Sequence, residues 1–172
     1  MIEGARRREE ILKILRTCDK PISGTELAGR FGVSRQVIVQ DVALLRAENR
    51  DILSTYRGYV LGNAGEKEEC IRVFCVNHAT EDTLDELQTI VDLGGQVLDV
   101  SVEHELYGNI RADLLIQNRL DAAEFAAKME HCQSQPLKVL TKGVHFHTVT
   151  AQSQRNLDLI ETALREKGYL AE

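Results

Sequence analysis

Apolar residues recur at helical spacing in the first part of the chain and predict short helices there. Ile11, Leu12 and Leu15 define the first helix, over residues 5–17. Pro21 interrupts this pattern, because proline is tolerated near helix starts and breaks helix interiors. The chain therefore begins with one amphipathic helix that needs other elements to cover its apolar side.

Two further helices carry start and stop signals. Ser23 followed by Glu26 forms a capping box, and Gly32 ends the short helix that it opens. Ser34 is the expected N-cap of the next helix. The buried face of that third helix is predicted from i, i+4 and i+7 spacing to consist of Ile38, Val42 and Leu45.

The segment after the third helix is predicted to be a β-hairpin. Residues 52–61 are apolar at both ends and turn at Arg57 and Gly58. Three helices followed by a hairpin are typical of a winged helix-turn-helix, in which the second helix braces a third helix that enters the major groove of DNA.

Strand and helix patterns alternate in the remainder of the chain, in the order β-α-β-β-α-β-α. The order favours a four-stranded, mainly antiparallel sheet with helices on one face, an open-faced sandwich, so the fold class is α+β. The predicted strands are 70–77, 97–103, 110–116 and 143–150, the last with a backward extension to Val139 left open, and the predicted helices are 80–93, 120–132 and 153–167.

A shift in composition separates the two patterns. Glycine, asparagine and a charge run predict a linker at 64–69, between a DNA-binding domain at 1–63 and a second domain at 70–172. Residues 1–61 carry 11 Lys and Arg against 8 Asp and Glu, whereas residues 62–172 carry 10 against 19. A basic first part joined to an acidic remainder suits a nucleic-acid reader attached to a different module.

Composition also bears on where the protein acts. The sequence contains no apolar run of about 18 residues and no pattern of a signal peptide, so we expect a cytoplasmic protein without a membrane span. Its four cysteines form no C-x-x-C pair, which favours reduced thiols over a metal site or disulfides.

The histidines of the second half offer metal-ligand chemistry. In a strand, His145 and His147 lie on one face, where two imidazoles can chelate an ion. Two exposed strand histidines are an equally good interpretation of this pair alone. His78 precedes a predicted helix and Glu86 lies about two turns inside it, so a shared site is plausible and not forced by spacing.

The first half resembles the helix-turn-helix of many bacterial repressors over residues 26–36, and Asp41, Leu44-Leu45-Arg46 and Arg57-Gly58-Tyr59 extend the resemblance through the wing. Such a fold would place the third helix against base edges, where arginine suits guanine and glutamine suits adenine. The alternative for each residue is a solvated surface position. The candidate DNA contacts are Arg35 and Gln36 to bases, Ser34 to phosphate, Gln40 one turn further, and Arg57 at the wing tip.

The second half resembles the three-histidine domain of the nicotinic-acid-responsive repressors. The residues that carry the resemblance are Val76-Asn77-His78, Glu86, Asp99–His104, Tyr107-Gly108 and Gly143–His147. The resemblance implies that His78, Glu86, His145 and His147 bind a metal. It also implies a protein that represses genes of NAD synthesis and niacin uptake, with nicotinic acid as co-repressor and operator DNA as partner. We expect a homodimer from the DNA-binding logic alone, since helix-turn-helix proteins bind palindromic operators as pairs. Glu105 and Leu106 depart from the expected turn after His104.

The ligand pocket and the metal are less defined. His104 and Tyr107 are candidate contacts for a small carboxylate, and an ordinary hydrogen-bonded histidine and a packed tyrosine are the alternatives. Three imidazoles and a carboxylate suit one divalent nickel, zinc or iron ion per chain. Three other functions stay open: a regulator whose signal is the metal itself, a structural metal that staples a dimerisation domain, and a metallo-enzyme. The sequence favours a non-enzyme, because it holds no second acid/base pair at a recognisable spacing.

Overall fold

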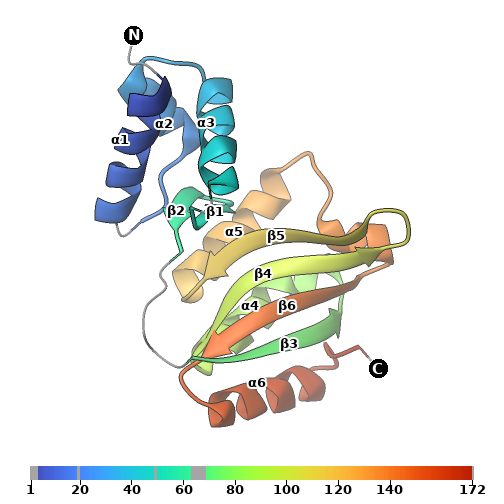
Figure 1. Cartoon of the computed structure of the whole chain (residues 1–172). Coiled ribbons are helices and arrows are strands. Elements are labelled where there is room, and N and C mark those ends of the chain that lie inside the picture. The colour runs from blue at the N-terminus through green and yellow to red at the C-terminus, as the bar shows by residue number, and fades with distance from the viewer. Residues whose placement is uncertain (1–3, 19, 49, 63–68, 172) are drawn as a thin grey trace. The chain divides into compact units, whose positions relative to one another are not determined.

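The computed structural model describes residues 4–18, 20–48, 50–62 and 69–171. The chain divides into two compact units, Met1–Gly65 and Glu66–Glu172. The predicted linker at 64–69 lies outside the described residues, apart from Glu69. Each unit is therefore considered by itself (Figure 1).

Three helices build the first unit: α1 (Gly4–Thr17), α2 (Gly24–Phe31) and α3 (Arg35–Ala47). The predicted caps are present, because the hydroxyls of Ser23 and Ser34 accept from the backbone N–H groups of Glu26 and Val37. The return half of the capping box is replaced by an ion pair, since the Glu26 carboxylate lies 2.7 Å from Arg30. The predicted face of α3 is buried and packs into the core of this unit, together with Asp41.

A buried ion pair fixes the first helix to the third. Arg7 Nε lies 2.6 Å from Asp41 Oδ2, and the two residues are 9% and 3% exposed. Arg8 Nη1 adds a second contact, 3.5 Å from Asp41 Oδ1. The pattern of apolar residues did not predict this pair, because both members occupy positions that read as polar. It holds the helix that carries the candidate DNA contacts against α1.

The hairpin is formed by β1 (Ile52–Thr55) and β2 (Gly58–Leu61), which are antiparallel. Backbone hydrogen bonds in both directions between Ile22 and Tyr59, of 2.9 and 2.8 Å, attach it to the segment before α2. Gly58 permits this approach, because a Cβ at its φ of 143° would collide with the backbone of Ile22. The winged helix-turn-helix predicted from the sequence is confirmed.

The second unit is a four-stranded sheet with helices, in the predicted order. The strand order is β3-β6-β4-β5 and every neighbouring pair is antiparallel. The elements are β3 (Cys70–Asn77), η1 (Thr80–Asp82), α4 (Thr83–Asp92), β4 (Gly95–His104), β5 (Gly108–Ile116), α5 (Arg119–His131), η2 (Leu137–Thr141), β6 (Val144–Ala151) and α6 (Gln154–Glu166). The backward extension of the last strand to Val139 is wrong, because that segment forms the 3-10 helix η2.

Alternation along the strands separates a covered face from an open one. On β3, Phe74 and Val76 are buried beneath the helices, whereas Ile71 and Val73 on the other side are 60% and 58% exposed. The core between sheet and helices draws on Leu87 and Ile90 of α4 and on Leu157, Ile160 and Leu164 of α6. The open-faced sandwich is confirmed. No described helix is long and apolar enough to cross a membrane.

The buried pair in the first unit yields a prediction. Asp41→Asn keeps the shape of the side chain but removes the charge that neutralises Arg7, so we expect a loss of about 3 kcal/mol in the free energy of unfolding. Denaturant unfolding followed by circular dichroism measures it. Glu10→Gln is the control, because its pair with Lys13 is exposed and removing it should cost under about 1 kcal/mol. Equal losses in both variants would contradict the prediction.

Candidate metal centre and DNA-reading surface

A fully buried carboxylate stands at the centre of the second unit. Glu86 lies in the first turns of α4 and is 0% exposed. His78, in the loop that follows β3, places its Nε2 atom 2.7 Å from Glu86 Oε2. The two residues predicted to share a site therefore do meet, since the short loop between β3 and α4 folds the helix back over the end of the strand.

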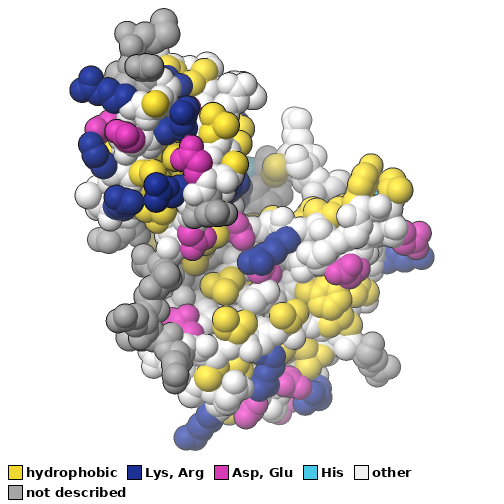
Figure 2. All heavy atoms as spheres, in the orientation of Figure 1, with side chains coloured by type: hydrophobic (Ala, Val, Ile, Leu, Met, Phe, Trp, Pro, Cys, Tyr) yellow, Lys and Arg dark blue, Asp and Glu magenta, His cyan; other side chains and the backbone are white. Residues whose placement is uncertain are grey.

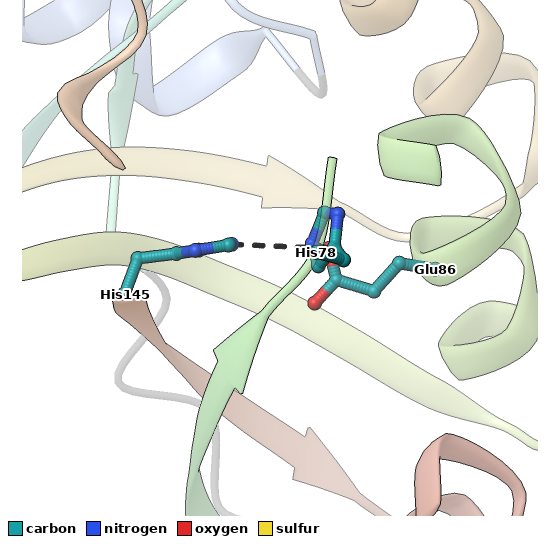
Figure 3. A group of neighbouring side chains, drawn as sticks. All are labelled: His78, Glu86 and His145. Atoms are coloured by element: carbon teal, nitrogen blue, oxygen red, sulfur yellow. Dashed lines mark ion pairs between the residues drawn. The ribbon is translucent and has the colours of Figure 1, made fainter. Parts of the chain in front are cut away.

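The strand β6 brings the other two histidines to the same carboxylate. His145 and His147 alternate toward the helices as predicted, and each is 3% exposed. Their Nε2 atoms lie 4.0 Å from Glu86 Oε2 and 3.5 Å from Glu86 Oε1, respectively. Figure 3 shows His145 reaching from its strand toward His78 and Glu86. The interpretation of this pair as two exposed strand histidines is wrong, because α4 covers that face of the sheet.

A hydrogen bond from Nδ1 to a backbone carbonyl orients each of the three histidine rings. The Nδ1 atoms of His78, His145 and His147 lie 2.8, 2.7 and 2.8 Å from the backbone carbonyls of Ala79, Gly143 and Asp99. A carbonyl can only accept, so each Nδ1 carries the proton. Each ring therefore directs its Nε2 atom toward Glu86, and a metal would bind Nε2 once this atom carries no proton, which is the arrangement of metal-binding histidines.

The inner atoms have the spacing of a coordination shell. Ligand atoms of His78, Glu86 and His145 all lie within 4.8 Å of one another. Around an ion bound at about 2.1 Å, neighbouring tetrahedral donors are about 3.4 Å apart. Both Glu86 oxygens and His78 Nε2 are buried, and the close contacts that Glu86 makes are with the three histidines, which fits a site built for a cation. His147 stands beside this group through its contact with Glu86.

The surroundings of Glu86, His145 and His147 shift their pKa values in different directions. Burial alone would raise the pKa of Glu86, but the neighbouring His147 and His78 outweigh it and hold this pKa well below its usual range. Burial likewise opposes the charged form of His147, yet the Glu86 carboxylate raises the pKa of this ring above its ordinary value. Burial and the charge of His147 lower the pKa of His145 to about 4. The Glu86 carboxylate thus favours the charged form of His147, whereas burial and His147 favour the neutral form of His145.

Lys138 in η2 is a residue of this centre that the sequence did not indicate. It is 7% exposed, and its ammonium lies 3.1 Å from the Ala79 carbonyl, 3.3 Å from the His78 carbonyl and 3.2 Å from Thr83 Oγ1. Its own carbonyl accepts from the Gly143 N–H at 2.8 Å. Lys138 therefore joins the loop that carries His78 to the turn that carries His145. A lysine in a short, otherwise apolar segment gives no signal of this role.

Asp99 is a second residue that the sequence did not single out. It lies in a β-bulge of β4, where the register shifts after Val97. Its carbonyl orients His147, while its carboxylate, 1% exposed, accepts from the Thr148 N–H at 3.2 Å and lies 2.8 Å from Arg111 Nη2. Bulges often adjust side chains next to functional sites, and this one places a backbone acceptor at a histidine of the candidate centre.

The candidate ligand contacts His104 and Tyr107 stand in the turn between β4 and β5. His104 Nδ1 accepts from the backbone N–H groups of Leu106 and Tyr107, and the two rings are 5.0 Å apart. Tyr107 is 72% exposed. Neither residue contacts Glu86 among the described residues. The hydrogen bonds that His104 accepts instead stabilise the turn that begins with Glu105.

The candidate DNA contacts of the first unit lie at the start of α3 and in the hairpin turn. Ser34, Arg35, Gln36 and Gln40 are exposed at the start of α3, and Ser34 caps that helix. Arg57 is half-buried in the hairpin turn, with its guanidinium carbon 5.3 Å from the centre of the Tyr56 ring. Polar side chains at the beginning of a recognition helix are positioned to meet base edges.

Fold and site together define a two-part protein, a winged helix-turn-helix joined to a domain with three histidines around one glutamate. Residues 71–172 match the model of the 3H domain family, and residues 7–60 match a helix-turn-helix domain model. The chain belongs to the 3H family, in its form with an N-terminal helix-turn-helix domain.

Two relatives align over almost the full length. The "Probable transcription repressor NiaR" of Thermotoga maritima is 41% identical over 166 residues, which cover 96% of this chain and 94% of the relative. The "Transcription repressor NadR" of Bacillus subtilis is 40% identical over 169 residues, which cover 97% and 94%. Both relatives are named as transcription repressors, one of them as a probable one.

Metal binding should depend on pH through His147. Because the pKa of this ring is raised above its ordinary value, the proton is held below that raised pKa and must leave when an ion takes Nε2. We expect affinity to weaken about tenfold per pH unit as pH falls from about 7 to about 6. Competition of zinc or nickel with a chromophoric chelator measures this slope. An affinity independent of pH would contradict the assignment of His147.

Removal of the Lys138 ammonium should loosen the second unit. Lys138→Met leaves the carbonyls of His78 and Ala79 and the Thr83 hydroxyl without their buried donor, so we expect a loss of about 2–3 kcal/mol in the free energy of unfolding. Lys142→Met is the matched control, because Lys142 is exposed and should cost under about 0.5 kcal/mol. The two variants are compared by thermal unfolding of metal-free protein, and similar shifts would rule out the role given to Lys138.

Proposed function

We propose that this chain is a DNA-binding transcription repressor of genes for NAD biosynthesis and niacin uptake, with nicotinic acid as its co-repressor. The DNA-binding domain is residues 1–63 and the sensing domain residues 70–172. The relatives named as transcription repressors support the first part of this proposal. A reader of operator DNA acts in the cytoplasm of a bacterial cell, where that DNA lies.

The observation that carries the sensing role is the common orientation of three imidazoles. Each of His78, His145 and His147 donates a hydrogen bond from Nδ1 to a backbone carbonyl and directs Nε2 toward the buried Glu86 carboxylate. These four residues would hold one divalent transition metal per chain. Nickel, zinc and ferrous iron all accept imidazole and carboxylate ligands. A bound metal would supply a Lewis-acid anchor for the pyridine nitrogen or the carboxylate of nicotinic acid.

The chain's own residues supply the remainder of the site. Glu86 neutralises part of the cationic charge, and Lys138 keeps the segments of His78 and His145 together. A bound dication, one carboxylate and one ammonium leave a positive balance, which favours an anionic ligand over a neutral one. This charge balance supports a carboxylic acid over its amide. His104 and Tyr107, at the end of β4 where β6 begins opposite, are retained as proposed contacts of the acid.

The reading of DNA is assigned to the start of α3 and to the wing. Arg35 and Gln36 would contact base edges, Ser34 and Arg57 the phosphates, and Gln40 the groove one turn further. Two copies would bind a palindromic operator, since helix-turn-helix proteins meet half-sites about one helical turn apart as dimers. Nicotinic acid would act by binding better to the arrangement of the two DNA-binding domains that fits the operator.

A metal-responsive regulator is the second candidate function. The burial of the four donors favours it, because the side chains of His78, Glu86, His145 and His147 are each less than 5% exposed and would enclose an ion closely. In that case the ion alone would change operator affinity. The test below separates the two candidates, since it varies metal and nicotinic acid independently.

Binding of the full-length chain to its own upstream DNA, followed by fluorescence anisotropy at fixed salt, tests the proposal. With metal-replete protein, nicotinic acid should tighten binding at least tenfold and nicotinamide should not, because only the acid carries the charge that the site favours. Metal without nicotinic acid should have little effect, and a full response to metal alone would favour the metal-responsive regulator.

Two variants test the roles of the two domains separately. His145→Ala should abolish the response to nicotinic acid and keep basal DNA binding, because the first unit is untouched. Arg35→Ala should weaken operator binding by about 1–3 kcal/mol and relax preference at one base pair. A structural metal would instead make His145→Ala unfold the second unit, which circular dichroism detects. Unchanged DNA affinity in Arg35→Ala would remove this residue from the interface.

A further inference from the structure

The side chains of the four candidate metal donors are closed off from solvent, since each is less than 5% exposed. Figure 2 shows almost no histidine surface on the face of the second unit that it displays. A metal site needs a path by which the ion arrives. Because the donors are covered in this arrangement, one of the covering segments must move aside before an ion can reach them.

One of these covers is the short segment that follows α6, residues 169–171. Gly168 ends the helix with a φ of 74°, and the Tyr169 N–H donates to the Leu164 carbonyl at 2.9 Å. This is the hydrogen bond of a helix end with glycine in the left-handed conformation, which turns the chain sharply. The turn directs the segment back toward the end of β3 (Figure 1).

Backbone hydrogen bonds attach this segment to β3 just before the first histidine of the centre. The Asn77 N–H donates to the Tyr169 carbonyl at 2.8 Å, and the Ala171 N–H donates to the Cys75 carbonyl at 3.0 Å. β3 stands at the edge of the four-stranded sheet, so the segment occupies the side of β3 that β6 does not. His78 follows Asn77 directly and therefore lies beside this contact.

The side chain of Tyr169 reaches two elements of the centre at once. Its ring centre lies 5.2 Å from the centre of the His78 ring. Its hydroxyl donates to Asp85 Oδ2 at 2.8 Å, and Lys167 Nζ lies 2.6 Å from the same oxygen. Asp85 precedes Glu86 in α4. Tyr169 thus covers one donor and is fixed to the helix that carries another.

The segment is held more weakly than the other covers of the centre. α4 is anchored in the core by Leu87 and Ile90, both 0% exposed, and β6 is paired on both sides. Lys138 of η2 donates to three acceptors and is buried. Residues 169–171 are only half-buried, and the side chain of Asp85, which holds the tyrosine, is 52% exposed. Parts with few buried contacts open first in a folded protein.

We propose that residues 169–171 form the gate of the metal centre, through which the ion enters and leaves. The gate opens when the segment separates from β3 and the Tyr169 ring leaves His78. Glu86, His145 and His147 stay in place on α4 and β6 during the opening. The gate controls how fast the ion exchanges, whereas the donors control how tightly it binds. The proposal rests on the metal centre of the proposed function and is independent of nicotinic acid.

Zinc exchange in the full-length chain tests the gate through Tyr169→Phe. This change keeps the ring beside His78 and removes the hydrogen bond to Asp85, so the segment should open more often. Zinc uptake and zinc release should both accelerate about tenfold. The dissociation constant should stay within about twofold of wild type, because the lost bond lies outside the set of donors. Stopped-flow mixing with a chromophoric chelator measures both rates.

Glu161→Gln is the matched control for general loosening of this side of the unit. Glu161 Oε2 lies 2.7 Å from Arg72 Nη1, an ion pair that attaches α6 to β3 without involving residues 169–171. Both zinc rates should stay within about twofold of wild type in this variant. Equal acceleration in Glu161→Gln and Tyr169→Phe would overturn the gate, because any loosening would then suffice.

Hydrogen exchange of metal-free protein provides a second measurement. The amides of Asn77 and Ala171 both donate across the contact, so one opening event exposes both. In Tyr169→Phe their exchange should accelerate by the same factor as the zinc rates, while the amides of α4 keep their wild-type protection. Zinc rates that rise while these two amides stay protected would overturn the proposal.

The remaining outcomes separate the gate from the proposed function. Unchanged zinc rates in Tyr169→Phe, or a weaker affinity with unchanged uptake, would overturn the gate and leave the metal centre standing. A wild-type chain that binds no zinc would overturn the centre and the gate together. Accelerated exchange in a chain whose DNA affinity ignores nicotinic acid would support the gate and refute the niacin response.

Discussion

The structure of the second unit depends on one buried carboxylate. A lone ionised Glu86 in a protein interior would cost several kcal/mol, and its charge is tolerated because three imidazoles surround it. That requirement fixes the neighbours: α4 must lie over the ends of β3 and β6, because only there do His78 and His147 reach it. The same arrangement that stabilises the carboxylate would also supply the donors of the proposed metal, in which case folding and metal binding would draw on one electrostatic interaction.

The sequence predicted the site well where periodicity decides geometry. His145 and His147 follow from strand alternation, and the short loop after β3 brings His78 to Glu86. Spacing alone did not predict that His145 and His147 lie near His78 and Glu86, because the order of strands along the chain does not say that β6 lies beside β3. The family resemblance supplied that link before the sheet order of the structure did.

What the sequence did not predict consists of contacts to backbone atoms and of buried charges. Lys138 acts through carbonyls, and no residue type announces which carbonyl will lie nearby. The bulge at Asp99 arises from how β4 pairs with two neighbours at once, which a single strand pattern does not encode. Hydrophobic periodicity treats every charged position as exposed, so it predicted Arg7 and Asp41 to be surface residues although they form a buried ion pair.

Asp99 also connects the two faces of the sheet. Its carbonyl holds His147 on the buried side, and its carboxylate contacts Arg111 on the open side. A ligand that shifts His147 must therefore be accommodated at a residue whose carboxylate lies on the open face of the sheet. Such a connection transmits a signal only if the strands around it have two arrangements of similar energy. A bulge is a suitable place for that, because its extra residue interrupts the hydrogen-bond ladder locally and lets one strand adjust while its neighbours stay paired. The candidate centre and the open face of the sheet can then respond to each other although they lie on opposite sides of β4 and β6.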